Sequence, residues 1–86
     1  MNQAIQFPDR EWWDDAQQAV CFPALVHGMQ CTCAIRVSVL QERFGESLEP
    51  LDLFRANRWD LEEEAQHCIE CQAEDSQGWF WLSSSR

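Results

Sequence analysis

Hydrophobic and polar residues alternate along the middle of this chain. Every second position from 29 to 37 is hydrophobic, and so is every second position from 20 to 26. The two sets are Met29, Cys31, Cys33, Ile35 and Val37, and Val20, Phe22, Ala24 and Val26. A period of two is typical of strands with one buried face, and His27-Gly28 between the runs matches a two-residue hairpin loop. The pattern therefore predicts a β-hairpin.

The loop also predicts the register of the two strands. Val26 should lie opposite Met29 and Phe22 opposite Cys33, so that the apolar side chains of both strands share one face. Pro23 has no N–H to donate. We therefore expect its strand to lie at a sheet edge on that side or to carry a bulge.

Shorter elements flank the hairpin. Ala4 to Phe7 has weak strand character and ends at Pro8, and the polar residues 14–18 lead into the hairpin. Gly78 to Leu82 is an aromatic run bounded by glycine and serine, which favours a terminal strand.

Helical signals fill the region between the hairpin and that last strand. Ser38 to Gln41 has the form of a capping box, and Gly45 is placed to end a short helix. Glu49-Pro50 begins a second helical stretch, and Asn57 marks a kink or restart. The helix after it has one stripe that faces the hairpin, made of Leu61, Ala65, Cys68, Ile69 and Gln72.

These elements predict an α+β fold in a single domain over residues 1–86. The expected sheet is small and antiparallel, with an N-terminal strand, the central hairpin and a C-terminal strand. Two to three helices pack on one of its faces. A chain of 86 residues has room for only one core.

Charge narrows the range of partners. The chain has 15 acidic and 6 basic residues, all of the latter arginine, for a net charge of −9, and residues 46–75 alone hold ten acids and two arginines. Such a field repels phosphate groups, so we expect no nucleic-acid partner and no membrane binding. The acidic surface either keeps the protein soluble or docks a basic protein partner.

The N-terminal segment lacks the features of an export signal. No basic segment precedes an apolar one in the first thirty residues, and the longest apolar run, Ala19 to Val26, contains Pro23. We expect a cytoplasmic protein. Five cysteines are an odd number, which favours reduced thiols over a disulfide framework.

Cysteine and histidine suggest one alternative chemistry. Cys68-x-x-Cys71 with His67 has the ligand types and spacing of a zinc site, and Cys31-x-Cys33 could add to it. A helix holds this CxxC pair apart, however, so we expect core cysteines, no metal and no cofactor. His67 and Cys71 lack a third orienting group, and we expect no enzyme activity. Cys21 faces away from the core side of the hairpin, which predicts the most accessible thiol, with Cys71 second.

Tryptophans give the strongest functional hint. Trp79 and Trp81 share one face of their strand, and Phe80 and Leu82 share the other. Either nearby tryptophans cover the first pair within a monomer, or the tryptophans belong to a contact surface, in which Trp and Arg are enriched. The candidate interaction surface comprises Trp12, Trp13, Arg58, Trp59, Trp79 and Trp81. We expect a monomer or a weak homodimer.

Several short segments resemble a known family over nearly the whole length. They are Ile5-x-Phe7-Pro8, Phe22-Pro-Ala24 through Gly28 to Cys33-x-Ile35, Arg43-Phe44-Gly45, Phe54-Arg55-x-Asn57-Arg58-Trp59, Leu61-Glu-Glu-Glu-Ala65 and Asp75-x-Gln77-Gly78-Trp79. In these the chain resembles the YrdB-like short bacterial proteins, a domain of unknown function. The resemblance implies an intact α+β domain of intracellular bacterial origin and supplies no activity or ligand. Cys31, Cys68 and Cys71 depart from the pattern, as does the stretch 35–38, which argues against a cysteine-based function for the family.

Two functions from different classes remain open at this point. The first is a non-catalytic protein-interaction or regulatory module that uses its acidic helical face and its tryptophans. The alternative is a small thiol or zinc-binding protein that uses Cys68, Cys71 and His67.

Overall fold

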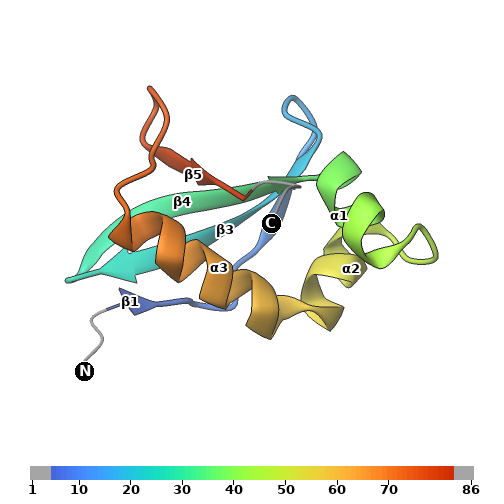
Figure 1. The fold of residues 1–86 in the computed structure, drawn as a ribbon, viewed down its shortest axis with the longest axis horizontal. Helices are drawn as coiled ribbons and strands as arrows, with labels where there is room; N and C mark the ends of the chain where they lie inside the picture. The colour runs from blue at the N-terminus through green and yellow to red at the C-terminus, as the bar shows by residue number, and fades with distance from the viewer. Residues whose placement is uncertain (1–4, 83–86) are drawn as a thin grey trace.

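The computed structural model describes residues 5–82, and within that range a five-stranded sheet carries three helices on one side (Figure 1). The α+β fold class is therefore confirmed. The strands are β1 (Ile5–Gln6), β2 (Trp12–Asp14), β3 (Ala19–Val26), β4 (Met29–Arg36) and β5 (Trp79–Trp81). The helices are α1 (Val37–Phe44), α2 (Pro50–Ala56) and α3 (Arg58–Glu70).

The hairpin is confirmed together with its register. β3 and β4 pair antiparallel, with Val26 opposite Met29, Phe22 opposite Cys33 and Val20 opposite Ile35. His27 and Gly28 both have positive φ, as a two-residue turn of this kind requires. Periodicity and turn chemistry were sufficient to predict the hairpin and its register, because both depend only on neighbouring residues.

The sheet is mixed, so the expectation of an antiparallel sheet is wrong in one respect. β5 pairs parallel with β4, with Cys33 opposite Phe80. The three helices between these strands form a crossover that carries the chain back over one face of the sheet, and β5 therefore runs in the same direction as β4.

β1 and β2 both pair with β3, and β2 lies where the sequence predicted no strand. β1 pairs with Leu25 and Val26, whereas β2 pairs with residues 19–21. Pro23 lies opposite the gap between them, where no neighbouring strand requires an N–H donor from position 23. β3 is therefore an interior strand and not an edge strand. The interruption in pairing is the gap between β1 and β2, and β3 itself carries no bulge.

The hydrophobic core lies between the helices and one face of the sheet. Phe22 and Phe54 meet at its centre, with ring centroids 4.8 Å apart. Phe80 and Leu82, which share one face of the last strand, belong to the same cluster. The buried members are Val20, Phe22, Ala24, Cys33, Ile35, Leu40, Leu53, Phe54, Leu61, Ala65, Ile69, Phe80 and Leu82.

The helix boundaries follow the sequence signals in part. α1 ends at Gly45 and α2 begins at Pro50, as predicted, and the break at Asn57 separates α2 from α3. The capping box at Ser38 is wrong, because α1 begins at Val37, whose N–H donates to the Gln18 carbonyl at 2.9 Å. The Asn57 amide does not cap α3; it donates to the Leu53 carbonyl at 2.9 Å.

Candidate interaction surfaces

The six residues of the predicted interaction surface occupy different parts of the fold. Trp13 pairs with Val20 and packs against the core. Trp12, Trp79 and Trp81 belong to strand positions on the opposite side of the sheet, which we call the outer sheet face. Arg58 and Trp59 begin α3, on the helix side. The structure therefore divides these residues between two separate surfaces and the core.

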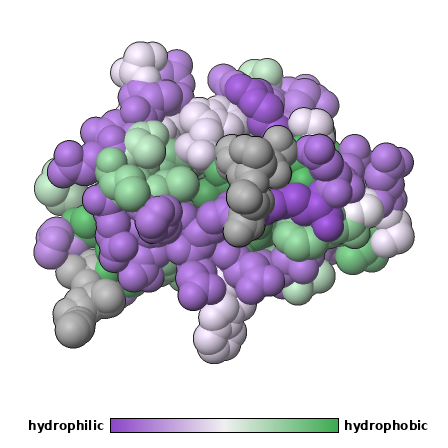
Figure 2. Space-filling model, in the orientation of Figure 1, coloured by the Kyte–Doolittle hydropathy of each residue, from purple (hydrophilic) through white to green (hydrophobic). Residues whose placement is uncertain are grey.

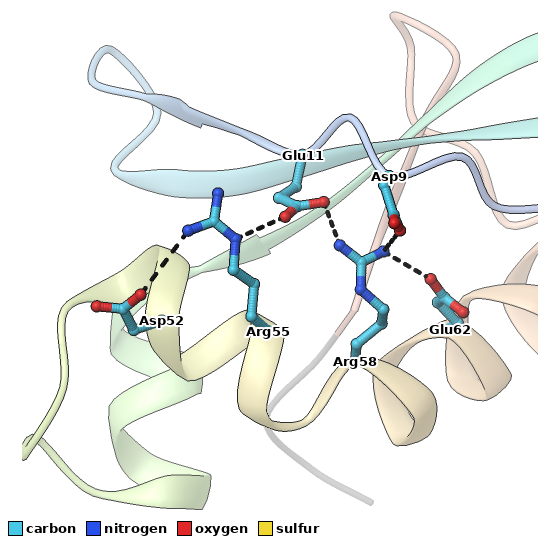
Figure 3. A network of polar contacts seen from close by, with 6 residues as sticks. All are labelled: Asp9, Glu11, Asp52, Arg55, Arg58 and Glu62. Atoms are coloured by element: carbon cyan, nitrogen blue, oxygen red, sulfur yellow. Dashed lines mark hydrogen bonds and ion pairs between the residues drawn. The ribbon is translucent and has the colours of Figure 1, made fainter.

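A charged network positions the start of α3. The segment between β1 and β2 carries Glu11, whose carboxylate lies between two guanidinium groups (Figure 3). Arg55 Nε donates to Glu11 Oε2 at 2.7 Å, and Arg58 Nη2 donates to Glu11 Oε1. Arg58 Nη1 also lies 3.0 Å from Glu62 Oε2 and 3.2 Å from Asp9 Oδ1. The network therefore ties the α2–α3 junction to the chain between β1 and β2.

Glu11 is partly buried and charged. Its side chain is 7% exposed. Burial alone would raise its pKa, but hydrogen bonds from Arg55 and Arg58 outweigh this effect and lower the pKa from 4.5 to about 2. The carboxylate therefore stays ionised at any physiological pH, and its two arginines stay paired.

A shallow hollow of about 380 Å³ opens beside this network. Its lining residues are Phe7, Trp59, Glu62, Glu63 and Gln66. Trp59 is 83% exposed, the highest value among the exposed large hydrophobic side chains of the described chain. An indole so exposed gains almost nothing from folding, so packing within this chain does not explain it.

Most arginines make contacts within the molecule, whereas the acidic residues outnumber their basic partners. Four arginines are engaged within the molecule: Arg43 pairs with Glu64, Arg55 and Arg58 with Glu11, and Arg36 lies 4.3 Å from the centre of the Trp81 ring. In the described range, no ion pair involves Glu63. Hydrophilic residues cover most of the face seen in Figure 2. The acidic excess is therefore left at the surface.

On the outer sheet face, small residues lie between tryptophans. The strand register aligns Trp12, Cys21, Ala34 and Trp81 in one row across the sheet. Cys21 and Ala34 have no exposed surface, whereas Trp12 is 38% exposed and Trp81 is partly exposed. The indoles therefore belong to a face that is apolar at its centre.

Asp75 holds Trp81 in place. One carboxylate oxygen accepts the backbone N–H groups of Gln77 and Trp79, and the other accepts the Trp81 indole N–H at 2.8 Å. These hydrogen bonds, led by that from Trp79, lower the pKa of Asp75. Asp75-x-Gln77-Gly78 is a recognisable turn signature, so this role of Asp75 was open to a closer reading of the sequence.

Cys21 is buried, so its predicted accessibility is wrong. Trp12 from β2 and Ala34 from β4 flank it on the outer sheet face, and Arg36 and Trp81 stack nearby. Burial, with a smaller effect of the negative charge of Asp14, raises the pKa of Cys21 to about 11. Cys21 is therefore buried although it lies on the side of the sheet that faces away from the helices.

The thiol and zinc alternative finds little support in the geometry. Cys71 is exposed and its Sγ lies 3.6 Å from His67 Nε2, but Cys68 packs against the core. Within residues 5–82, no three His, Cys, Asp or Glu side chains are grouped to hold a metal ion. Cys71 and His67 lie close together, but a metal site would need at least one more ligand.

No helix in the described part of the chain has both the length and the apolar character required to cross a membrane.

Comparisons with known proteins place the chain in a family. The model of the family "Protein of unknown function (DUF1488)" matches residues 5–82. The chain is 62% identical over 84 residues to "Uncharacterized protein YrdB" of Escherichia coli (strain K12) and of Shigella flexneri, covering 95% of this chain and 99% of each relative. A crystal structure of a DUF1488 protein of unknown function from Shewanella loihica PV-4 superimposes with a TM-score of 0.89 at 36% identity, covering 95% of this chain and 94% of that one. The chain belongs to the DUF1488 family, and the predicted resemblance to YrdB is confirmed.

Proposed function

We propose that this protein is a non-catalytic protein-interaction module that docks a basic segment of a partner protein in the hollow beside α3. The observation that carries the proposal is the exposure of Trp59, 83%, at the edge of a hollow whose other lining residues include two carboxylates. An exposed tryptophan next to acidic groups has the composition of a cation-binding surface.

The lining residues match a guanidinium or ammonium group. Phe7 and Trp59 offer aromatic faces, over which a cation is attracted by the ring quadrupole. Glu63 supplies a carboxylate that the described chain does not pair, whereas Glu62 already binds Arg58 at 3.0 Å. An incoming basic side chain would therefore gain an ion pair with Glu63 without breaking the network at Glu11.

The protein already binds its own arginines in this manner. The guanidinium carbon of Arg58 lies 5.1 Å from the centre of the Phe54 ring while its nitrogens contact Glu11 and Glu62. Arg43 lies 6.0 Å from the Phe44 ring and pairs with Glu64. Two arginines of this fold therefore each contact an aromatic ring and a carboxylate, and the hollow offers the same combination to an external cation.

Long-range charge favours the same partner. Residues 46–75, which include α2 and α3, hold ten of the fifteen acidic residues. A field of this sign raises the association rate of a basic segment and repels acidic ones, an effect that falls as salt is added.

The test compares two substitutions in the hollow with a matched control. Binding of a fluorescent peptide of alternating arginine and serine should weaken at least tenfold on Trp59→Ala and several-fold on Glu63→Gln. Glu70→Gln, an equal charge change at an exposed α3 position outside the hollow, should have a smaller effect. A glutamate–serine peptide should not bind. Equal binding by the native protein and Trp59→Ala would refute the docking site.

A further inference from the structure

The outer sheet face differs in charge from the rest of the molecule. Thirteen strand residues point to this side by register: Gln6, Trp12, Asp14, Ala19, Cys21, Pro23, Leu25, Gln30, Thr32, Ala34, Arg36, Trp79 and Trp81. They include one acid and one base, in a chain whose net charge is −9. Asp75 adds one negative charge at the rim, through its bond to Trp81. The face is thus nearly neutral and rich in tryptophan.

We propose that the outer sheet face is the contact surface for a second copy of this chain. This surface lies on the opposite side of the sheet from the hollow at α3, and the proposal does not depend on the docking of a basic partner. A basic partner would find no acidic excess on these strands. A second copy, in contrast, can approach through them while the acidic helices of both molecules point away from each other.

The strand register makes the face self-complementary. Asp14 and Arg36 lie in one row, each one strand away from Ala19 on β3. A two-fold axis that runs along β3 between two facing copies exchanges the β2 side with the β4 side. Asp14 of each molecule then faces Arg36 of the other, so that the interface contains two equivalent pairs of opposite charge.

The same axis also positions Trp12. Trp12 and Ala34 occupy a second row, again one strand to either side of β3, where Cys21 lies between them. The two-fold operation therefore places Trp12 of each copy over Ala34 of the other. Ala34 has no exposed surface, so the indole of Trp12, which is 38% exposed in one copy, packs on the side chains around Ala34 and becomes buried near the centre of the interface.

Trp81 holds Arg36 in place for this contact. Arg36 stacks over its ring at 4.3 Å, Trp79 lies 5.7 Å away between ring centres, and Asp75 holds the indole nitrogen at 2.8 Å. Arg36 therefore loses little side-chain freedom when it meets Asp14 of the second copy, which lowers the entropic cost of association.

A charge exchange tests the proposal. Sedimentation equilibrium from 5 μM to 1 mM protein in about 150 mM salt should show a monomer–dimer equilibrium for the native chain. Asp14→Arg and Arg36→Asp should each weaken dimerisation at least tenfold, because each places like charges opposite one another. The double variant Asp14→Arg with Arg36→Asp should dimerise at least several-fold more tightly than either single variant, because opposite charges face each other again.

Two controls separate this contact from other effects. Arg10→Asp makes the same charge change as Arg36→Asp at an exposed position outside the outer sheet face, and it should weaken dimerisation less than threefold. Circular dichroism of each variant checks that the fold is kept. A native chain that remains monomeric at 1 mM, or a dimer that neither single exchange weakens, would overturn the proposal.

Discussion

Glu11 and Arg58 form an ion pair although 47 positions separate them in the chain. Glu11 precedes β2, and Arg58 is the first residue of α3, next to Trp59. Pro23 lies opposite the gap between β1 and β2. The chain leaves the sheet at this gap and brings Glu11 to the helices. This contact therefore ties the first turn of α3, which carries Trp59, to the segment between β1 and β2, which carries Phe7.

Replacing Glu11 with Gln should destabilise the fold. Removing one member of a partly buried charge network leaves the other without its partner, and Arg58 is only 23% exposed. Since Arg55 is more exposed and can turn to solvent, we expect a loss of about 2 to 3 kcal/mol in urea unfolding at pH 7. The exposed Glu46→Gln, measured in parallel, should change stability by less than about 0.5 kcal/mol.

The same residue predicts a pH dependence. The pKa of Glu11 is about 2 in the folded protein and 4.5 ordinarily, so the folded state binds fewer protons between these values. The stabilisation, up to about 3 kcal/mol, is complete above pH 4.5 and lost as the pH falls towards 2. Subtracting the pH profile of Glu11→Gln from that of the native protein should isolate this slope. Parallel profiles would show that the Glu11 pKa is not lowered.

Thiol labelling should single out Cys71. It is the exposed cysteine, whereas burial raises the pKa of Cys33 to about 12 and of Cys21 to about 11. Burial also raises the pKa of Cys68. Because the thiolate is the reactive form, these three should label only on unfolding, and partly exposed Cys31 should be intermediate. Peptide mass spectrometry after a short pulse of maleimide gives the order, and early labelling of Cys21 would mean that the outer sheet face opens.

The tryptophans should differ in their contributions to stability. Trp59→Ala removes a side chain that is 83% exposed, so the unfolding free energy should change by less than about 0.5 kcal/mol. Phe54→Ala, in the core beneath Arg58, should cost about 3 to 5 kcal/mol. The loss of Trp59 should also remove the most acrylamide-quenchable part of the fluorescence. A large loss of stability in Trp59→Ala would indicate that this indole packs against the domain.

Local signals account for the parts of the fold that the sequence predicted. The hairpin followed from alternation and from Gly28, and α2 from Pro50. β2 was missed because three residues, two of them adjacent tryptophans, show no period. The direction of β5 depends on the path of three helices, which no local pattern reports.

The candidate sites depended on contacts between distant residues. Trp59 was named as an interaction residue, but its neighbours Phe7 and Glu63 in the hollow could not be inferred from spacing. Glu11 is one of fifteen acidic residues, and nothing in its local sequence marks it as the one that joins Arg55 and Arg58. The burial of Cys21 likewise required β2 and β5, which place Trp12 and Trp81 in its row.

Gly45 provides a test of backbone strain alone. Its φ of 91° and ψ of 179° lie in a region that is almost exclusive to glycine, and its N–H donates to the Gln41 carbonyl at 2.8 Å. A Cβ built on Gly45 meets no heavy atom within 4 Å, so Gly45→Ala adds no clash. We expect Gly45→Ala to lose about 1 to 3 kcal/mol of unfolding free energy through its backbone. D-Alanine at position 45, introduced by chemical ligation, favours positive φ and should retain the native stability. Equal losses with both enantiomers would trace the effect to the added methyl group and contradict the backbone explanation.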